Sequence, residues 1–306
     1  MAHTARSGVI ALIIACTIWG LAPIYYKALA HVPPLEVLTH RTLWSMLIFC
    51  VYLALQGRLA EVWRLIRSRD LPVVALGAVM ISINWFVFIR SIQIGRTVEA
   101  SLGYYIFPIV AVVLGTVFFG ERLNRTQAAT VALAVLAVGV LTYGLGVAPW
   151  VALLLAVTFG IYAVIKKRLK AGPVVSVTAE VALMAPLALY WLWHLHDGGQ
   201  GHFGHDWRTS LLLAFAGFVT AVPLMLFSYA SRRVTMAAFG LTQYLNPTLQ
   251  FLCATLIFRE AFTGWHLTAF ALIWAAVAVF ALQAVVQDKT ARRAVSSAAT
   301  SGTTVI

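Results

Sequence analysis

Three charged residues lie within long apolar stretches of this chain, where a charge needs a chemical reason. They are Arg41, Glu99 and Glu180. A charged side chain at the centre of a bilayer costs about 2.5–3.5 kcal/mol on insertion scales, so such residues are usually paired or functional. An arginine there could anchor a solute, and a glutamate could carry a proton or contact a cation.

Amide and aromatic side chains accompany these charges. Asn84 and Gln243 lie deep in two apolar stretches, and a buried amide must find hydrogen-bond partners. Each could bind a solute or bond a neighbouring helix. The apolar stretches also hold many aromatic residues, namely Trp19, Tyr25, Tyr26, Trp85, Tyr104, Tyr105 and Tyr244. An aromatic-lined cavity with a few polar anchors suits amphipathic or aromatic solutes, although Tyr25 and Tyr26 could instead lie at the membrane interface.

The composition places all of these residues in an integral membrane protein. Of the 306 residues 61% are hydrophobic and 10% are charged, less than half the roughly 25% charge of a soluble domain. A spanning helix needs about 20 apolar residues. We predict ten spans, over residues 8–28, 35–56, 71–90, 97–119, 125–143, 149–166, 174–194, 209–230, 234–258 and 265–286, with a disordered tail from Gln287. Nucleic-acid binding is not expected, because basic residues collect on the cytoplasmic side of membrane proteins.

A pattern repeated 139 residues later shows that the chain contains two copies of one unit. The matched pairs are Leu102 and Leu241, Tyr105 and Tyr244, Pro108 and Pro247, Thr116 and Thr255, Phe119 and Phe258, and Glu121 and Glu260. The sequence therefore predicts a first repeat over 1–146, a second over 147–286 and the tail over 287–306. Trp19-Gly20 and Lys27 match Phe159-Gly160 and Lys167 at an offset of 140, which argues that the first segment is a retained helix rather than a signal peptide.

The distribution of lysine and arginine predicts the orientation. If the N-terminus is cytoplasmic, sixteen of the 22 basic residues fall in cytoplasmic segments and five outside, with Arg41 inside a span. Both termini are then cytoplasmic. Because each repeat has an odd number of spans, the second repeat must be inverted relative to the first. Duplicated inverted units with a site between them are common in secondary transporters.

The predicted depths constrain how the charges pair. Arg41 and Glu180 occupy equivalent positions of the two repeats, roughly 9 Å into their helices, but in opposite halves of the membrane. We therefore expect no direct ion pair between them, and expect Arg41 to pair with Glu99 near the outer surface. Snorkelling of Arg41 to the headgroups is the alternative. Glu180 could couple protons or contact a cation, or simply pair with Lys166 or Lys167.

Several strings resemble the EamA family of the drug/metabolite transporter superfamily, and more narrowly its RarD-like subgroup. They are the proline and terminal glutamate of spans 4 and 9, Trp19-Gly20, His40-Arg41, Asn84-Trp85, the run Glu99–Tyr104, Gln243-Tyr244 and the run Pro247–Phe251. The resemblance covers about residues 8–286. It implies ten helices, a plasma-membrane exporter or permease, and a site between the repeats.

We therefore expect a secondary transporter that moves a small organic metabolite or drug by alternating access. The predicted solute-binding residues are an outer cluster of Arg41, Asn84, Glu99 and Tyr104, an inner cluster of Glu180, Gln243 and Tyr244, and Trp19 and Trp85 at the midplane. No GxxxxGK[ST] loop is present, so ATP is not expected as the direct energy source. Proton coupling through Glu99 or Glu180, exchange and facilitated diffusion are all compatible, and the oligomeric state is open.

A membrane enzyme or a non-transporting scaffold or receptor subunit are the alternatives. The sequence holds no HExxH and no GxSxG motif, and we expect no cofactor and no metal. The histidine-rich loop from His194 to His205 could bind a metal, but its glycines favour a solvated loop. Pro108 and Pro247 would act either as hinges or as fixed bends. Glu121 and Glu260 are expected to cap helices or to pair with nearby arginines.

Overall fold

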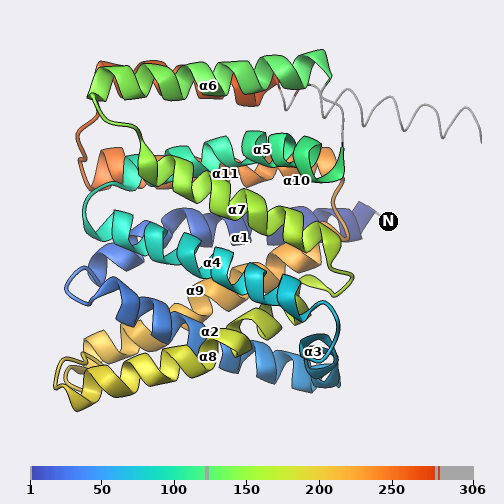
Figure 1. Ribbon diagram of the computed structural model, residues 1–306, viewed down its shortest axis with the longest axis vertical. Helices are drawn as coiled ribbons and strands as arrows, with labels where there is room; N and C mark the ends of the chain where they lie inside the picture. The colour runs from blue at the N-terminus through green and yellow to red at the C-terminus, as the bar shows by residue number, and fades with distance from the viewer. Residues whose placement is uncertain (1, 121–123, 280–281, 283–306) are drawn as a thin grey trace, which may run out of the picture.

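The fold is all-helical over residues 2–120, 124–279 and 282, which a computed structural model of the chain describes (Figure 1). Eight helices are long and apolar enough to cross a membrane. They are α1 (Ala2–Ala28), α2 (Pro34–Leu55), α4 (Leu71–Gln93), α5 (Thr97–Phe119), α6 (Arg125–Leu145), α7 (Trp150–Arg168), α8 (Pro173–Asp197) and α9 (Trp207–Ser231). They correspond to the first eight predicted spans. Glu121, the tail and the end of the tenth predicted span lie outside the described residues.

The ninth predicted span is not one continuous helix. It consists of α10 (Met236–Gln243), α11 (Leu245–Leu252) and a π-helical turn over Cys253–Ile257, with the break at Tyr244. Pro247 lies just after the break and has no N–H to donate to the carbonyl of Gln243, four residues earlier, which weakens the helix there. Its equivalent Pro108 lies inside α5, which runs on without interruption. A final apolar helix over Gly264–Val279 completes ten membrane segments.

A short helix, α3 (Leu59–Ile66), lies between the second and third predicted spans. Val62 and Leu65 are buried on one of its faces, while the salt bridge between Arg58 and Glu61 is on the surface. This one-sided pattern is typical of a helix that lies flat on a protein or membrane surface. Arg58 holds the pKa of the Glu61 carboxyl below its ordinary value through their hydrogen bonds.

The helices pack with approximate two-fold symmetry. In the first repeat α1 packs on α9 and α11, and in the second α7 packs on the equivalent α4 and α5. Gly20 of α1 contacts Leu249 of α11, and Gly160 of α7 contacts Val110 of α5. Val110 and Leu249 are 139 positions apart, so the two contacts are equivalent. The absence of a Cβ at both glycines lets each helix pair approach closely, which explains why glycine follows an aromatic residue in both repeats.

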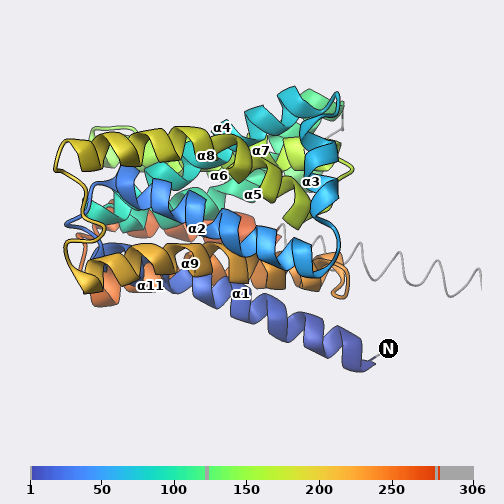
Figure 2. The same cartoon turned by 90° about the horizontal axis from the view of Figure 1, so that it is seen from below.

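The two ends of the bundle carry different elements (Figure 2). The N-terminus and α3 lie at one end, and the loop between α8 and α9 lies at the other, beside the link between α1 and α2. Along one edge in Figure 1, α6 packs against the final helix, and Tyr143 of α6 contacts Trp265. Exposed apolar side chains such as Val135 and Leu136 of α6 face outward, as expected for helices in contact with lipid.

Candidate functional site

A cavity of about 310 Å³ lies between the two repeats, and equivalent residues of both line it. The pairs 139 or 140 positions apart that line it are Trp19 and Phe159, Ala22 and Tyr162, Tyr26 and Lys166, Ile81 and Thr220, Trp85 and Leu224, Phe88 and Phe227, and Tyr104 and Gln243. The cavity therefore lies on the pseudo-two-fold axis. Its walls are largely aromatic, with a few polar groups, as in many small-molecule sites.

Arg41 is buried in the wall of this cavity, with 5% of its surface exposed. Its Nη1 donates a hydrogen bond to the Tyr26 hydroxyl, 2.6 Å away. Its guanidinium lies 4.0 Å from the centre of the Trp85 ring, which is a cation–π contact. The side chain therefore stays in the protein interior and does not snorkel to a headgroup.

Asn84 is fully hydrogen-bonded by its neighbours. Its Nδ2 donates to the Leu155 carbonyl and the Thr158 hydroxyl on α7, both at 2.9 Å, and its Oδ1 accepts from the Tyr104 hydroxyl. Asn84 and Tyr104 also line the cavity. The amide thus joins α4, α5 and α7, so that the cavity wall includes a fixed polar network rather than a free amide.

Glu180 is buried and paired with Lys166, and pairing with Lys166 or Lys167 is one of the two predicted alternatives. Its Oε1 lies 2.5 Å from the Lys166 Nζ, and its Oε2 accepts a hydrogen bond from the Tyr162 hydroxyl at 2.9 Å. Lys166 and Tyr162 line the cavity, whereas Glu180 lies behind them. Gly77 of α4 lies so close that a Cβ there would be 3.1 Å from the carboxylate.

The break in the ninth span faces the same cavity. Gln243 ends α10, Asn246 lies in the first turn of α11, and Gln250 follows one turn later. All three line the cavity. Gln250 donates to the Asn246 side chain, while its own Oε1 is buried without a partner. A discontinuous helix beside a central cavity is a common feature of transporter sites.

Besides Glu180, two other predicted residues, Glu99 and Tyr244, do not line this cavity. Glu99 is 3.6 Å from Arg96 on its own helix, so the expected pair with Arg41 is not formed. The pair was expected because both residues were predicted to lie in the outer half of the membrane. In the structure Arg41 contacts Tyr26 and Glu99 contacts Arg96. Tyr244 stacks on Tyr105, with ring centres 6.3 Å apart, and is not among the lining residues. Whether any of the nine predicted residues binds a solute stays a prediction.

Glu260 caps a helix, as expected for the terminal glutamates of the repeat. Its carboxylate accepts the backbone N–H groups of Thr97 and Val98 at 2.9 and 2.8 Å, in the first turn of α5. These N–H groups have no partner within the helix, and a carboxylate there also interacts favourably with the helix dipole. Glu260 of the second repeat thereby stabilises the N-terminus of α5, a helix of the first repeat that lines the cavity.

The α8–α9 loop packs onto α2 at one end of the bundle, and none of its residues lines the cavity. Phe203 of this loop stacks on His40, with ring centres 4.8 Å apart. The completely buried carboxylate of Glu36 accepts hydrogen bonds from the His202 backbone at 2.7 Å and binds its ring Nδ1 at 2.8 Å. At the opposite end the cavity reaches Ala171 and Pro173, which are partly exposed.

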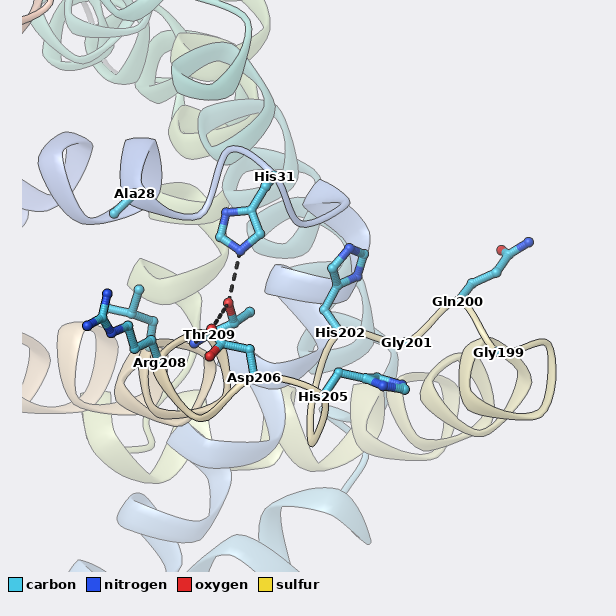
Figure 3. Close-up of a pocket in the computed structure, with 11 residues that line it drawn as sticks. Ala28, His31, Gly199, Gln200, Gly201, His202, His205, Asp206, Arg208 and Thr209 are labelled. Atoms are coloured by element: carbon cyan, nitrogen blue, oxygen red, sulfur yellow. Dashed lines mark hydrogen bonds between the residues drawn. The ribbon is translucent and has the colours of Figure 1, made fainter.

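A larger depression, about 850 Å³, lies on the outside of the same loop (Figure 3). His31 bonds Thr209 across it, whereas His202 and His205 point in different directions. Asp206 caps α9 by accepting the Thr209 N–H at 2.9 Å, and this hydrogen bond lowers the pKa of its carboxyl. No three His, Cys, Asp or Glu side chains of the described residues converge as metal ligands. This depression is lined largely by exposed loop residues. The central cavity is therefore the stronger candidate for a functional site.

Several polar residues that line the cavity were not among the predicted site residues, including Tyr26, Lys166, Asn246 and Gln250. Tyr26 and Lys166 could have been found by applying the repeat offset of 140, since they are equivalent to one another. Asn246 and Gln250 follow Gln243 at helical spacing, and this row of three amides in an apolar span was an available signal.

Comparisons with known proteins agree with this architecture. The EamA-like transporter family matches residues 6–143 and again residues 147–282. An uncharacterised transporter of Vibrio cholerae is 38% identical over 292 residues, 95% of this chain and 97% of that protein. Protein RarD of Escherichia coli K12 is 36% identical over 286 residues, 93% of this chain and 97% of RarD. One solved crystal structure shares the fold, with a TM-score of 0.62 and 19% identity over 91% of this chain and 98% of that one. The chain is therefore an integral membrane protein that belongs to the EamA-like transporter family, with two copies of the family's domain.

Proposed function

We propose that this protein is a secondary transporter that carries a small organic solute through the central cavity. The observation that carries the proposal is the position of the cavity on the pseudo-two-fold axis, where both repeats contribute equivalent residues. In such an arrangement, rocking of one repeat against the other exposes the same site first to one side and then to the other. The names of the relatives, which are called transporters, support the same class of activity.

The proposal includes an orientation. The excess of lysine and arginine at the end that carries α3 and the α7–α8 link favours a cytoplasmic position for this end and for both termini. The cavity reaches the surface at Ala171 and Pro173 in the α7–α8 link. We therefore interpret the conformation as inward-open, in the plasma membrane, with the α8–α9 loop closing the outer side.

The test is solute exchange by the purified full-length chain in liposomes. The vesicles are loaded with a labelled panel of amino acids, organic acids and aromatic drugs, and efflux of each compound is compared with that from empty liposomes. At least one compound should leave faster through the protein. Ala171→Trp should slow that efflux at least about tenfold, because Ala171 lines the mouth of the cavity. This tenfold change corresponds to about 1.4 kcal/mol.

Lys170→Trp is the matched control, since Lys170 is the exposed neighbour of Ala171 and does not line the cavity. It adds the same bulky side chain to the same link and should leave efflux largely unchanged. If every compound leaves at the rate of empty liposomes, or if Ala171→Trp transports at the full rate, the cavity is not a transport path.

A further inference from the structure

Arg41 is a buried cation without a counter-ion in the part of the chain that the structure describes. Its only hydrogen bond there is from Nη1 to the neutral Tyr26 hydroxyl, and its buried Nε has no partner. A guanidinium has five N–H donors, so most of its capacity is unused. None of the described residues that line the cavity is an aspartate or a glutamate. Burying an unpaired charge is costly, and a ligand of opposite charge would offset that cost.

In the second repeat, the charge at the equivalent position is neutralised by an ion pair. Glu180 is equivalent to Arg41, and Lys166 is equivalent to Tyr26. Glu180 and Lys166 form an ion pair, so this position carries no net charge. In the first repeat the same contact joins Arg41 to an uncharged tyrosine. One net positive charge therefore remains in the cavity, at Arg41, while the Lys166 charge is compensated by the protein.

The surroundings of Arg41 limit the size and character of the compensating anion. Trp85 covers the guanidinium, and Phe88, Tyr104 and Phe159 extend the aromatic wall. The volume of about 310 Å³ is at the lower end of the roughly 300–1,000 Å³ of small-molecule sites. An inorganic anion would leave these apolar walls without a partner, and a large drug would exceed the space.

We propose that the cavity binds a small organic monocarboxylate with an aromatic body, its carboxylate on Arg41 and its body between the aromatic rings. This substrate class rests on the proposed transport function and makes it more specific. Arginine suits the role because its planar set of donors matches the two oxygens of a carboxylate.

The test uses three probes with the same carbon skeleton: 3-phenylpropionate, 3-phenylpropanamide and 3-phenylpropylamine. Their affinities for the detergent-solubilised full-length chain are measured at pH 7 by titration calorimetry. The carboxylate should bind at least about tenfold more tightly than the amide, because only the carboxylate brings a negative charge to the Arg41 guanidinium. The amine should bind least, because its charge is repelled by Arg41.

Two variants remove the preference for the carboxylate in different ways. Arg41→Gln removes the charge, and Tyr26→Glu supplies a counter-ion from the protein itself, at the position where the second repeat has the partner of its ion pair. Both should bind carboxylate and amide within about twofold of each other. The second variant keeps the test valid if the first does not fold. Arg90→Gln is the control, because Arg90 is an exposed arginine of α4 outside the cavity, and it should keep the wild-type preference.

The outcomes separate this proposal from the transport function. If the amide binds the wild type as tightly as the carboxylate, if none of the probes binds, or if the preference survives both Arg41→Gln and Tyr26→Glu, the anion site is wrong. Efflux of other solutes blocked by Ala171→Trp would then still support transport. If the carboxylate binds through Arg41 but does not cross liposomes that contain the protein, the anion site stands and the transport function fails.

Discussion

Single residues of this protein could be identified from the sequence more readily than their partners. Arg41 and Glu180 were evident because a charge is rare in an apolar stretch. The partner of Arg41 was predicted wrongly as Glu99, since depth in the membrane does not say which face of a helix a side chain occupies. The partner of Glu180 was predicted as one of two adjacent lysines, and the structure selects Lys166. Only the direction in which each lysine side chain points, which the sequence does not give, could decide between them.

The Lys166–Glu180 pair leads to a prediction at this scale. Glu180→Gln should destabilise the protein by about 3 kcal/mol or more, because Lys166 would remain as an uncompensated charge in the interior. Adding Lys166→Met to this variant should recover part of the loss, giving a coupling energy of at least about 1 kcal/mol. The free energy of unfolding is measured by denaturant titration in detergent micelles.

Glu61→Gln provides the comparison for that cycle. It breaks the pair with Arg58, which is exposed on α3, and exposed pairs contribute little to stability. Its stability should therefore differ little from that of the wild type. Additive effects of Glu180→Gln and Lys166→Met would show that the two buried charges do not depend on one another.

At the scale of helices, the repeat predicted most of the architecture, and local chemistry decided the exceptions. Hydropathy and the offset of 139 located ten membrane segments, but could not distinguish two prolines at equivalent positions. Pro108 leaves α5 intact, whereas the break before Pro247 presents Gln243 and Asn246 to the cavity. The surface helix α3 was missed because its eight residues are too few to span a membrane, and hydropathy locates spans only.

The packing of α9 on α2 provides the prediction for this scale. A Cβ at Gly217 of α9 would lie 2.6 Å from the Cβ of Trp44 and 2.7 Å from its backbone carbonyl carbon. The backbone cannot move aside as a flexible side chain would, so Gly217→Ala should separate the helices. Such overpacking costs about 1–3 kcal/mol, which is measured as a lower unfolding free energy in micelles.

Gly139 of α6 is the matched control, because nothing lies within 4 Å of a Cβ built there. Gly139→Ala should leave stability unchanged or raise it by about 0.4–1 kcal/mol, since alanine restricts the unfolded chain. Equal losses in both variants would show that the close approach of α9 and α2 does not govern the effect, since alanine favours the helix at both positions.

For the whole molecule, the proposed alternating access requires the two ends of the bundle to open in turn. The end that carries the α8–α9 loop, which we propose is the outer one, is held by Phe203 on His40 and by Glu36 on His202. The sequence placed this loop outside but offered no sign that Phe203 packs inward, because a single phenylalanine among glycines and histidines has no periodic pattern. Weakening the contact should shift the population towards outward-open molecules.

Phe203→Ala tests that expectation with a native thiol as reporter. Cys16 lines the cavity, and replacing Cys50 and Cys253 by serine leaves it as the only cysteine. In the otherwise unchanged protein, a membrane-impermeant maleimide should label Cys16 from the cytoplasmic side faster than from the outside, in vesicles of opposite orientation. Phe203→Ala should raise the outside rate several-fold, because each molecule spends more time open to that side. Leu187→Ala, on the exposed face of α8, should not. If labelling in Phe203→Ala still occurs from the cytoplasmic side alone, the loop does not hold the outer end closed, and the closure must lie deeper, at Tyr26 and Arg41.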